Sequence, residues 1–199
     1  MHNISGTILA GGTSRRFHGR TKSNIIIDGA TIISRITDTI KDLFNEIIIV
    51  TNTPEEFKEY TDYKVVGDQF LDAGPLGGIH AALKSSSNQT IFVFAGDMPL
   101  LDKRLIINQI EYYYNNSCDI LIPRIGDYTE PLHSILSISV LKTLGEYLSG
   151  NNGYAVREFI KMLKVRYLQF EGSEENKIAF TNVNSPADIS AVEKILGKY

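Results

Sequence analysis

The sequence predicts an α/β fold: a three-layer, Rossmann-like sandwich with a mostly parallel central sheet. Short, unbroken apolar segments alternate along the chain with longer segments whose apolar residues recur at helical spacing. The segments at residues 46–51 and 90–95 have no polar face between their ends, as expected for strands that helices cover on both sides. Glycine-rich or polar turns follow several of these strands, at the end of the sheet where ligands bind in folds of this class.

The first half of the chain alternates strand and helix. Residues 4–9 are expected to form a strand that runs into glycines, and residues 31–44 a helix, because isoleucines recur there at helical spacing. Residues 46–51 are an unbroken apolar strand, and residues 63–66 a short one. A helix over residues 75–83 begins with a proline, which the first turn of a helix accepts.

The middle of the chain continues the same alternation. Residues 90–95 predict another buried strand, and residues 103–114 predict a helix with apolar residues on neighbouring faces. Two further short apolar segments, residues 119–123 and residues 132–136, predict strands.

The last third is more mixed. Residues 140–148 and 154–163 have helical spacing, and residues 165–170 read as a strand. Ser185 followed by Pro186 predicts the start of a final helix, because serine is a favoured N-cap and proline a favoured first residue.

Composition and charge exclude several classes of protein. The chain has 199 residues, and we predict a single domain over residues 1–199. Its net charge of −3 and its apolar runs, far shorter than the roughly 20 residues of a membrane helix, argue against nucleic-acid and membrane partners. A single cysteine, Cys118, excludes an internal disulfide and a cysteine-rich zinc site. No signal peptide is visible, so we expect a cytoplasmic protein.

The most informative segment is the glycine-rich turn after the first strand, which reads Leu9-Ala10-Gly11-Gly12 and continues through Ser14 and Arg16 to Lys22. Glycines let backbone N–H groups approach phosphate oxygens, and the serine hydroxyl adds a donor. Arginine and lysine supply the positive charge that phosphoryl transfer needs. The spacing fits neither a Walker loop nor a dinucleotide fingerprint. The segment therefore predicts a different kind of phosphate site, with a plain tight turn as the alternative.

Two aspartates follow later strands. Asp97 comes two positions after the strand predicted over residues 90–95, where a carboxylate would point into the crevice and suit Mg²⁺. Its alternative role is the N-cap of the next helix, but Asp102 is better placed for that. Asp68 follows residues 63–66 and either faces a ligand or caps its own turn.

Together these segments resemble the molybdenum cofactor guanylyltransferases, a family of the nucleotidyltransferase superfamily. The first matching block is Leu9-Ala10-Gly11-Gly12 with Ser14, Arg16, Phe17 and Lys22. The later blocks match in order and span nearly the whole chain: Asp68, Gly74-Pro75-Leu76-Gly77-Gly78-Ile79, Asp97-Met98-Pro99-Leu100 and Asn182-Val183-Asn184-Ser185-Pro186-Ala187-Asp188.

The resemblance implies GTP as donor, molybdopterin as acceptor and Mg²⁺ as cofactor, with molybdoenzymes or their chaperones as candidate partners. It implies an N-terminal part that binds the nucleotide and a C-terminal part that binds the acceptor. Leu9, Ala10, Gly11, Lys22 and Asp68 would contact the nucleotide, Asp97 would bind Mg²⁺ and the triphosphate, and Asn182 and Asn184 would face the acceptor. The phosphate chemistry above adds Gly12 and Ser14 to the nucleotide site. It makes Arg16, Lys22 and Asp97 the expected catalytic residues.

The spacing and chemistry of Asn182 and Asn184 allow two interpretations of their role. In an extended chain the side chains of Asn182 and Asn184 point the same way. Their amides can read the edge of a pterin through paired donors and acceptors. Alternatively, and equally well, both asparagines form the turn that precedes the helix start at Ser185.

The chain departs from the family pattern in three places. His18 precedes Gly19 where members often carry two glycines, and Thr21 stands before the lysine where Asp or Pro is usual. Val50 stands where a polar residue, often Asn, is common. Asn52 would share its face of the strand and is the candidate substitute. These departures leave base selection and loop geometry open more than nucleotidyl transfer.

Other functions therefore stay open. One alternative is cytidylyl or other nucleotidyl transfer to molybdopterin or to another phosphorylated acceptor. The Gly11-Gly12 pair argues against the cytidylyl form, whose members tend to carry Ala-Gly there. The other alternative is a non-catalytic adaptor, against which the presence of Arg16, Lys22 and Asp97 argues.

Overall fold

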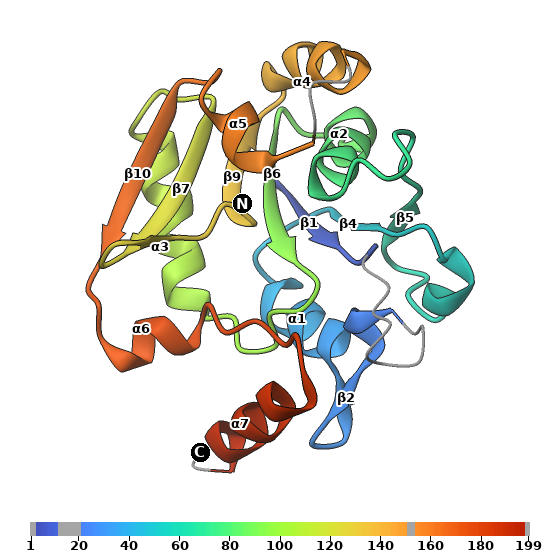
Figure 1. Ribbon diagram of the computed structural model, residues 1–199, viewed down its shortest axis with the longest axis vertical. Helices are drawn as coiled ribbons and strands as arrows, with labels where there is room; N and C mark the ends of the chain where they lie inside the picture. Colours follow the sequence, from blue (N-terminus) through green and yellow to red (C-terminus); the bar gives the residue numbers. More distant parts are fainter. Residues whose placement is uncertain (1–2, 12–20, 151–153, 198–199) are drawn as a thin grey trace.

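The structure, a computed structural model, describes residues 3–11, 21–150 and 154–197. Its centre is an eight-stranded sheet in which seven strands follow the order β10-β7-β9-β6-β1-β4-β5, while β8 pairs with β7 (Figure 1). The strands are β1 (Ser5–Leu9), β4 (Ile47–Val50), β5 (Lys64–Val66), β6 (Thr90–Ala95), β7 (Ile120–Ile125), β8 (Tyr128–Thr129), β9 (His133–Ser137) and β10 (Val165–Phe170).

The sheet is mostly parallel, which confirms the prediction. β1 runs parallel to both β4 and β6, β4 parallel to β5, and β7 parallel to β10. β9 is antiparallel to both of its neighbours, β6 and β7. The chain adds β4 and β5 on one side of β1 and then returns to add β6 on the other side. This reversal next to β1 creates a crevice at the carboxyl ends of the strands.

Helices cover both faces of the sheet and complete the three layers. They are α1 (Ile32–Ile40), α2 (Pro75–Ser85), α3 (Lys103–Tyr114), α4 (Val140–Ser149), α5 (Val156–Ile160), α6 (Glu174–Ile178) and α7 (Pro186–Leu196). α1 and α3 pack on one face, and α2, α4 and α5 on the other. The apolar run of β4 serves both faces, because Ile47 and Ile49 join the first core while Ile48 and Val50 join the second. None of the described helices is long and apolar enough to span a membrane.

The C-terminal segment returns to the crevice. After β10 and α6 the chain passes the carboxyl end of β6, where the Val183 N–H donates to the Asp97 carbonyl at 2.8 Å. α7 then packs beside a small hairpin of β2 (Ile26–Ile27) and β3 (Ala30–Thr31), at the bottom of Figure 1. The last segment of the chain therefore lies against the site that earlier strands build.

The structure corrects several predicted boundaries. The helix predicted over residues 31–44 ends at Ile40, because Lys41 begins a turn. The helix predicted over residues 154–163 is only α5. The β2–β3 hairpin was not predicted, although its turn is an Asp-Gly pair in which both residues have positive φ. The short α6 and the 3-10 turns η2 (Lys22–Asn24) and η3 (Pro54–Phe57) were also missed, because elements this short carry too few residues to show a period.

Candidate active site

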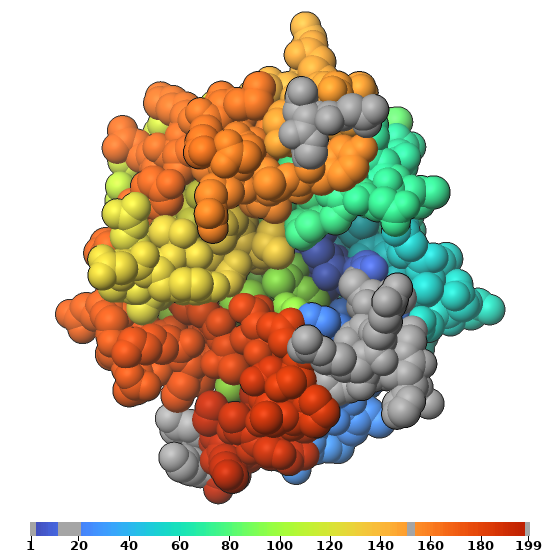
Figure 2. Space-filling model, in the orientation of Figure 1, coloured from blue at the N-terminus to red at the C-terminus, as the bar shows by residue number. Residues whose placement is uncertain are grey.

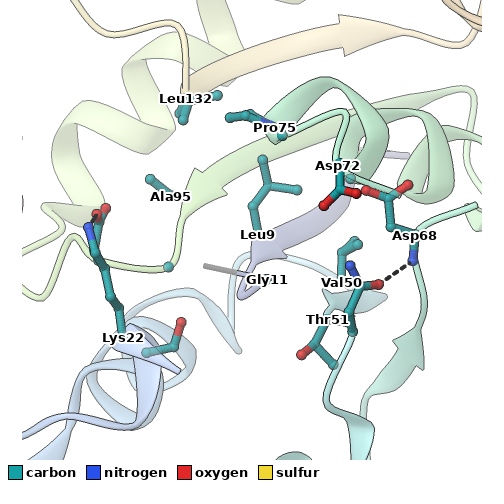
Figure 3. A pocket seen from close by; sticks show the side chains of 16 residues that line it. Leu9, Gly11, Lys22, Val50, Thr51, Asp68, Asp72, Pro75, Ala95 and Leu132 are labelled. Atoms are coloured by element: carbon teal, nitrogen blue, oxygen red, sulfur yellow. Dashed lines mark hydrogen bonds and ion pairs between the residues drawn. The ribbon is translucent and has the colours of Figure 1, made fainter. Parts of the chain in front are cut away.

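A cavity of about 460 Å³ opens at the carboxyl ends of β1, β4 and β6 (Figure 3). Its middle is largely apolar and is lined by Leu9, Val50, Pro75, Ala95 and Leu132. In Figure 2 the surface is hollowed where the dark-blue end of β1 shows between the green α2 region and the red C-terminal segment. The position is the one that the strand order predicts for a ligand site.

One end of the cavity holds a lysine, a carboxylate and an amide. The Lys22 ammonium lies 3.2 Å from Asp97 Oδ2 and donates to Asn184 Oδ1 at 2.5 Å. The side chains of Lys22 and Asp97 are 24% and 22% exposed, so both can still reach a ligand. The sequence separates these residues widely, but the structure brings all three together.

Lys22 is positioned by a chain of threonine hydroxyls. Thr21 is only 1% exposed, and its hydroxyl oxygen lies 3.1 Å from the hydroxyl oxygen of Thr53. The Thr53 hydroxyl in turn lies 3.2 Å from that of Thr51, at the end of β4. The threonine that stands where the family prefers Asp or Pro therefore ties the Lys22 turn to the neighbouring strand.

Asp97 is positioned by the close packing of Gly96. The Gly96 N–H donates to the Leu9 carbonyl at 3.1 Å, which joins the ends of β6 and β1. A Cβ on Gly96 would lie 2.4 Å from Ser23 Oγ and 2.6 Å from the Leu9 carbonyl oxygen, closer than such atoms approach. Only glycine fits this position without displacing its neighbours.

The structure does not use Asp97 as the N-cap of the following helix, the alternative role that the sequence offered. Asp102 is the N-cap of α3 and accepts a hydrogen bond from the Arg104 N–H at 2.7 Å. Asp97 instead faces the cavity beside Lys22. The sequence reasoning that preferred Asp102 as the cap is confirmed.

The glycine-rich turn is described only in part. Leu9 and Gly11 line the cavity. Ala10 is buried, and its N–H donates to the Val50 carbonyl at 2.8 Å, so that donor is already used within the sheet. The predicted site residues Gly12, Ser14 and Arg16 lie outside the described residues, and their roles stay predictions.

Asp68 lies at the other end of the cavity, across Leu9 and Val50 from Lys22 (Figure 3). Its Oδ1 accepts a hydrogen bond from the Phe70 N–H at 2.8 Å, so Asp68 caps its own turn as well as facing the cavity. Its backbone N–H donates to Asn52 Oδ1 at 3.0 Å. Burial raises the pKa of the Asp68 carboxyl.

The structure gives Val50 and Asn52 different roles. Val50 is 3% exposed and packs into the core beneath the cavity. Asn52 lines the cavity and holds the backbone of Asp68. Asn52 therefore supplies a polar group near the position that Val50 leaves apolar.

The asparagines of the C-terminal segment lie on either side of a buried residue. Val183 is fully buried, and Asn184 reaches Lys22. Asn182 makes no hydrogen bond to any residue that the structure describes. The backbone N–H groups of Asn184 and Ser185 both donate to Asp188 Oδ2 at 2.8 Å, which confirms the predicted start of the final helix.

His133 is structural rather than catalytic. It is 1% exposed, and its ring lies edge-on to the rings of Phe92, Phe94 and Phe180. Its Nδ1 lies 3.0 Å from Gln109 Nε2. Burial lowers the pKa of His133 to about 3, so the ring stays neutral at physiological pH.

The residues present are compatible with Mg²⁺. Among residues 3–11, 21–150 and 154–197, no group of three or more His, Cys, Asp or Glu side chains is placed to hold a metal. Mg²⁺ does not need such a group, because it commonly binds one or two carboxylates together with substrate phosphates and water. Asp97, partly exposed at the lysine end of the cavity, is a suitable carboxylate.

Sequence reasoning missed some of the cavity residues. Ser23, Thr51, Asp72 and Gly96 all line the cavity but were not selected. Thr51 and Gly96 directly follow strands, so the rule that ligand residues follow strand ends could have found them. No local signal distinguishes Asp72 from a solvent-exposed loop aspartate.

Comparison with known proteins gives a consistent family. Residues 6–167 match the family model described as the MobA-like NTP transferase domain. A probable molybdenum cofactor guanylyltransferase of Natranaerobius thermophilus is 36% identical over 98% of each chain. A molybdenum cofactor guanylyltransferase of Desulfosudis oleivorans is 30% identical over 97% of this chain and 96% of its own.

Solved structures agree with the fold. The molybdopterin-guanine dinucleotide biosynthesis protein A of Archaeoglobus fulgidus superposes with a TM-score of 0.83, at 24% identity, over 98% of this chain and 100% of its own. A CMP:2-keto-3-deoxy-manno-octonic acid synthetase complexed with CTP gives a TM-score of 0.74 at 11% identity, over 98% of both chains. Enzymes named for different bases therefore share this fold.

Proposed function

The chain belongs to the molybdenum cofactor guanylyltransferase family, and from this premise we propose that it transfers GMP from GTP to molybdopterin with Mg²⁺ as cofactor. Membership of the family makes the chain a nucleotidyltransferase. The observation that carries the proposal is the cluster of Lys22, Asp97 and Asn184 at one end of a nucleotide-sized cavity.

The proposed reaction is an in-line displacement at the α-phosphorus of GTP. A terminal phosphate oxygen of molybdopterin forms the new P–O bond, and the bond between the α-phosphorus and the bridging oxygen breaks. Pyrophosphate leaves with that electron pair. The attacking oxygen is already anionic, so the site needs no strong general base. Catalysis then depends on positioning and on the neutralisation of charge.

Lys22 supplies the positive charge in this scheme. Its ammonium lies at the lysine end of the cavity, where it can bind phosphate oxygens and stabilise the leaving pyrophosphate. Its contact with Asn184 joins the nucleotide site to the C-terminal segment that we assign to the acceptor. We propose the same division for the whole chain, one domain over residues 1–199 with nucleotide binding in the N-terminal part.

Asp97 is the residue that would hold Mg²⁺. When bound, the ion would supply a Lewis acid that neutralises charge on the phosphate oxygens. Asp97 itself orients Lys22 through the 3.2 Å ion pair and is fixed by the backbone hydrogen bond from Val183 to its own carbonyl. We further propose that the enzyme acts in the cytoplasm, where molybdoenzymes or their chaperones would receive the product.

The proposal is tested by a turnover assay with the purified chain. The protein is incubated with molybdopterin, Mg²⁺ and each of GTP, CTP, ATP and UTP, and both pyrophosphate and the dinucleotide product are quantified. We expect both products with GTP and Mg²⁺, and neither without the metal. Product with CTP instead would overturn the base but keep the chemistry, while nucleotide binding without turnover would favour the adaptor.

A further inference from the structure

The end of the cavity opposite Lys22 carries two carboxylates, Asp68 and Asp72, which differ in their hydrogen bonding. Asp68 is engaged by its loop through one oxygen, because its Oδ1 accepts the Phe70 N–H. Asp72 makes no hydrogen bond or ion pair with any described residue. Figure 3 shows the Asp72 carboxylate in the cavity, on the same side as Asp68. Asp72 is therefore the carboxylate at this end with both oxygens available to a ligand.

The backbone holds Asp72 in a conformation that few residues adopt. Its φ is +64°, and the other non-glycine residue with positive φ in the described ranges is Asp28, in the β2–β3 hairpin. Aspartate and asparagine tolerate this region better than most residues, but glycine adopts it without strain. Asp28 is accounted for by its hairpin turn. The side chain of Asp72 lies in a cavity, where it can contribute to ligand binding.

The charges of the cavity fix the direction of a bound nucleotide. Among the described residues that line the cavity, Lys22 is the one cation. At that end the charge of Asp97 is paired with Lys22, whereas Asp68 and Asp72 at the other end have no cation beside them among the described lining residues. A triphosphate is therefore favoured at the Lys22 end and repelled from the end that carries Asp68 and Asp72. The base is the part of a nucleotide farthest from the phosphates, so it lies against Asp68 and Asp72.

A carboxylate at this position favours one base over the others. Guanine presents two adjacent donors, the N1–H and the 2-amino group, which match the two oxygens of a single carboxylate. Adenine and cytosine each place an acceptor next to their amino group, and uracil places a carbonyl on each side of its N–H. An ionised aspartate, which only accepts hydrogen bonds, would face at least one acceptor on each of those bases.

We infer that Asp72 selects guanine by accepting hydrogen bonds from its N1–H and 2-amino group. Asp68 holds the loop through Phe70 and Asn52 and still faces the nucleotide with its other oxygen. The inference rests on the proposed function and deepens it, because it assigns the base specificity of the same cavity to one side chain.

The test uses ITP, which keeps the N1–H of guanine but lacks the 2-amino group. Dissociation constants for GTP and ITP with Mg²⁺ are measured by calorimetry for the unmodified chain, Asp72→Asn and Asp28→Asn. We expect the unmodified chain to bind GTP about tenfold or more tightly than ITP, the ratio that a hydrogen bond to a charged group typically gives. Asp72→Asn should bind both nucleotides with similar affinity, because the asparagine amide turns a donor toward the donors of guanine.

Asp28→Asn is the matched control. It makes the same change at the other aspartate with positive φ, which does not line the cavity, so its preference for GTP should equal that of the unmodified chain. Asparagine tolerates positive φ as well as aspartate does. If the Asp72→Asn variant is too unstable to measure, Asp72→Gly removes the carboxylate and adopts the positive φ without strain.

The outcomes separate this inference from the function on which it rests. If the unmodified chain prefers GTP and Asp72→Asn keeps the full preference over ITP, the inference is wrong and the proposed function stands. If Asp72→Asn instead loses discrimination between GTP and 2′-deoxyGTP, Asp72 reads the ribose and not the base. If the unmodified chain prefers CTP, the guanylyl assignment itself fails.

Discussion

Replacing Gly96 with alanine should damage both the stability and the activity of the protein. Gly96 joins the carboxyl ends of β6 and β1, directly before Asp97. A Cβ there would lie 2.6 Å from the backbone oxygen of Leu9 and 3.2 Å from Ala10 Cα. Backbone atoms at the end of a central strand cannot move aside as a flexible side chain would. The two strand ends must therefore separate.

The size of both effects can be estimated. Forcing an extra carbon into packed structure destabilises a protein by about 1–3 kcal/mol, and losing the bond from the Gly96 N–H to the Leu9 carbonyl adds about 1 kcal/mol. For a chain of this length, each kcal/mol corresponds to roughly 2–4 °C, so we expect the Tm to fall by about 5–15 °C. A displacement of about 1 Å at Asp97 would lower turnover by about a hundredfold.

Thermal unfolding and pyrophosphate release, measured below the Tm of the variant, test this reasoning. The control is Gly145→Ala in α4, where the nearest atom to the new Cβ, His80 Nε2, lies at an ordinary 3.5 Å. That variant should be stabilised by up to about 1 kcal/mol and keep full turnover, because alanine favours a helix over glycine. A Gly96→Ala protein with unchanged Tm and rate would refute the close-packing account of the Asp97 loop.

Three further predictions follow from the contacts of the site and of the opposite end of the sheet. Asp97→Asn should lower turnover by about a hundredfold to a thousandfold. It should shift the Tm little, because a partly exposed ion pair contributes only about 0–1 kcal/mol. Normal turnover would show that Asp97 is not a catalytic residue. Asn52→Ala should raise the KM for GTP by about threefold to tenfold, since it removes the acceptor that holds the Asp68 N–H; an unchanged KM would show that Asp68 needs no such support. Burial raises the pKa of Glu46, but hydrogen bonds from Ser5 and Ser87 outweigh it and hold the pKa below the ordinary 4.5. The stability from Glu46 is therefore fully present above pH 4.5 and is lost as the pH falls through the lower folded-state pKa. Glu46→Gln should make the free energy of unfolding less dependent on pH in this acid range. The same pH dependence in the variant and the unmodified chain would contradict this.

The sequence was informative where one face of an element is buried. The strands of the sheet other than the two-residue β8, and the four longest helices, were expected near their observed positions, because burial on a sheet imposes an unbroken apolar run or a helical period. The hairpin at Asp28 was missed although Asp-Gly is a strong turn signal, since its flanking strands are too short to show alternation. Length of pattern, rather than local propensity, separated the elements that could be predicted from those that could not.

The site could be predicted only in part, for a related reason. Lys22 follows the glycine-rich turn, and Asp68 and Asp97 each come two residues after a strand, so the position of the crevice predicted them. Asp72 has no such signal: its importance comes from a backbone conformation and from its position opposite Lys22, and both depend on the folded loop. Gly96 resembles any other loop glycine until the approach of Ser23 and Leu9 is known.

The shared contacts of Lys22 also limit what single substitutions can show about the acceptor site. Its ammonium binds Asp97 and Asn184 at once, so removing Asn184 changes the environment of a residue that we assign to the triphosphate. Residues in one hydrogen-bonded network do not contribute additively. A rise in the KM for molybdopterin on replacing Asn184 would therefore not identify an acceptor contact by itself. Substituting Asn182, which makes no hydrogen bond within the described residues, is the cleaner probe of that segment, because it leaves the Lys22 network intact.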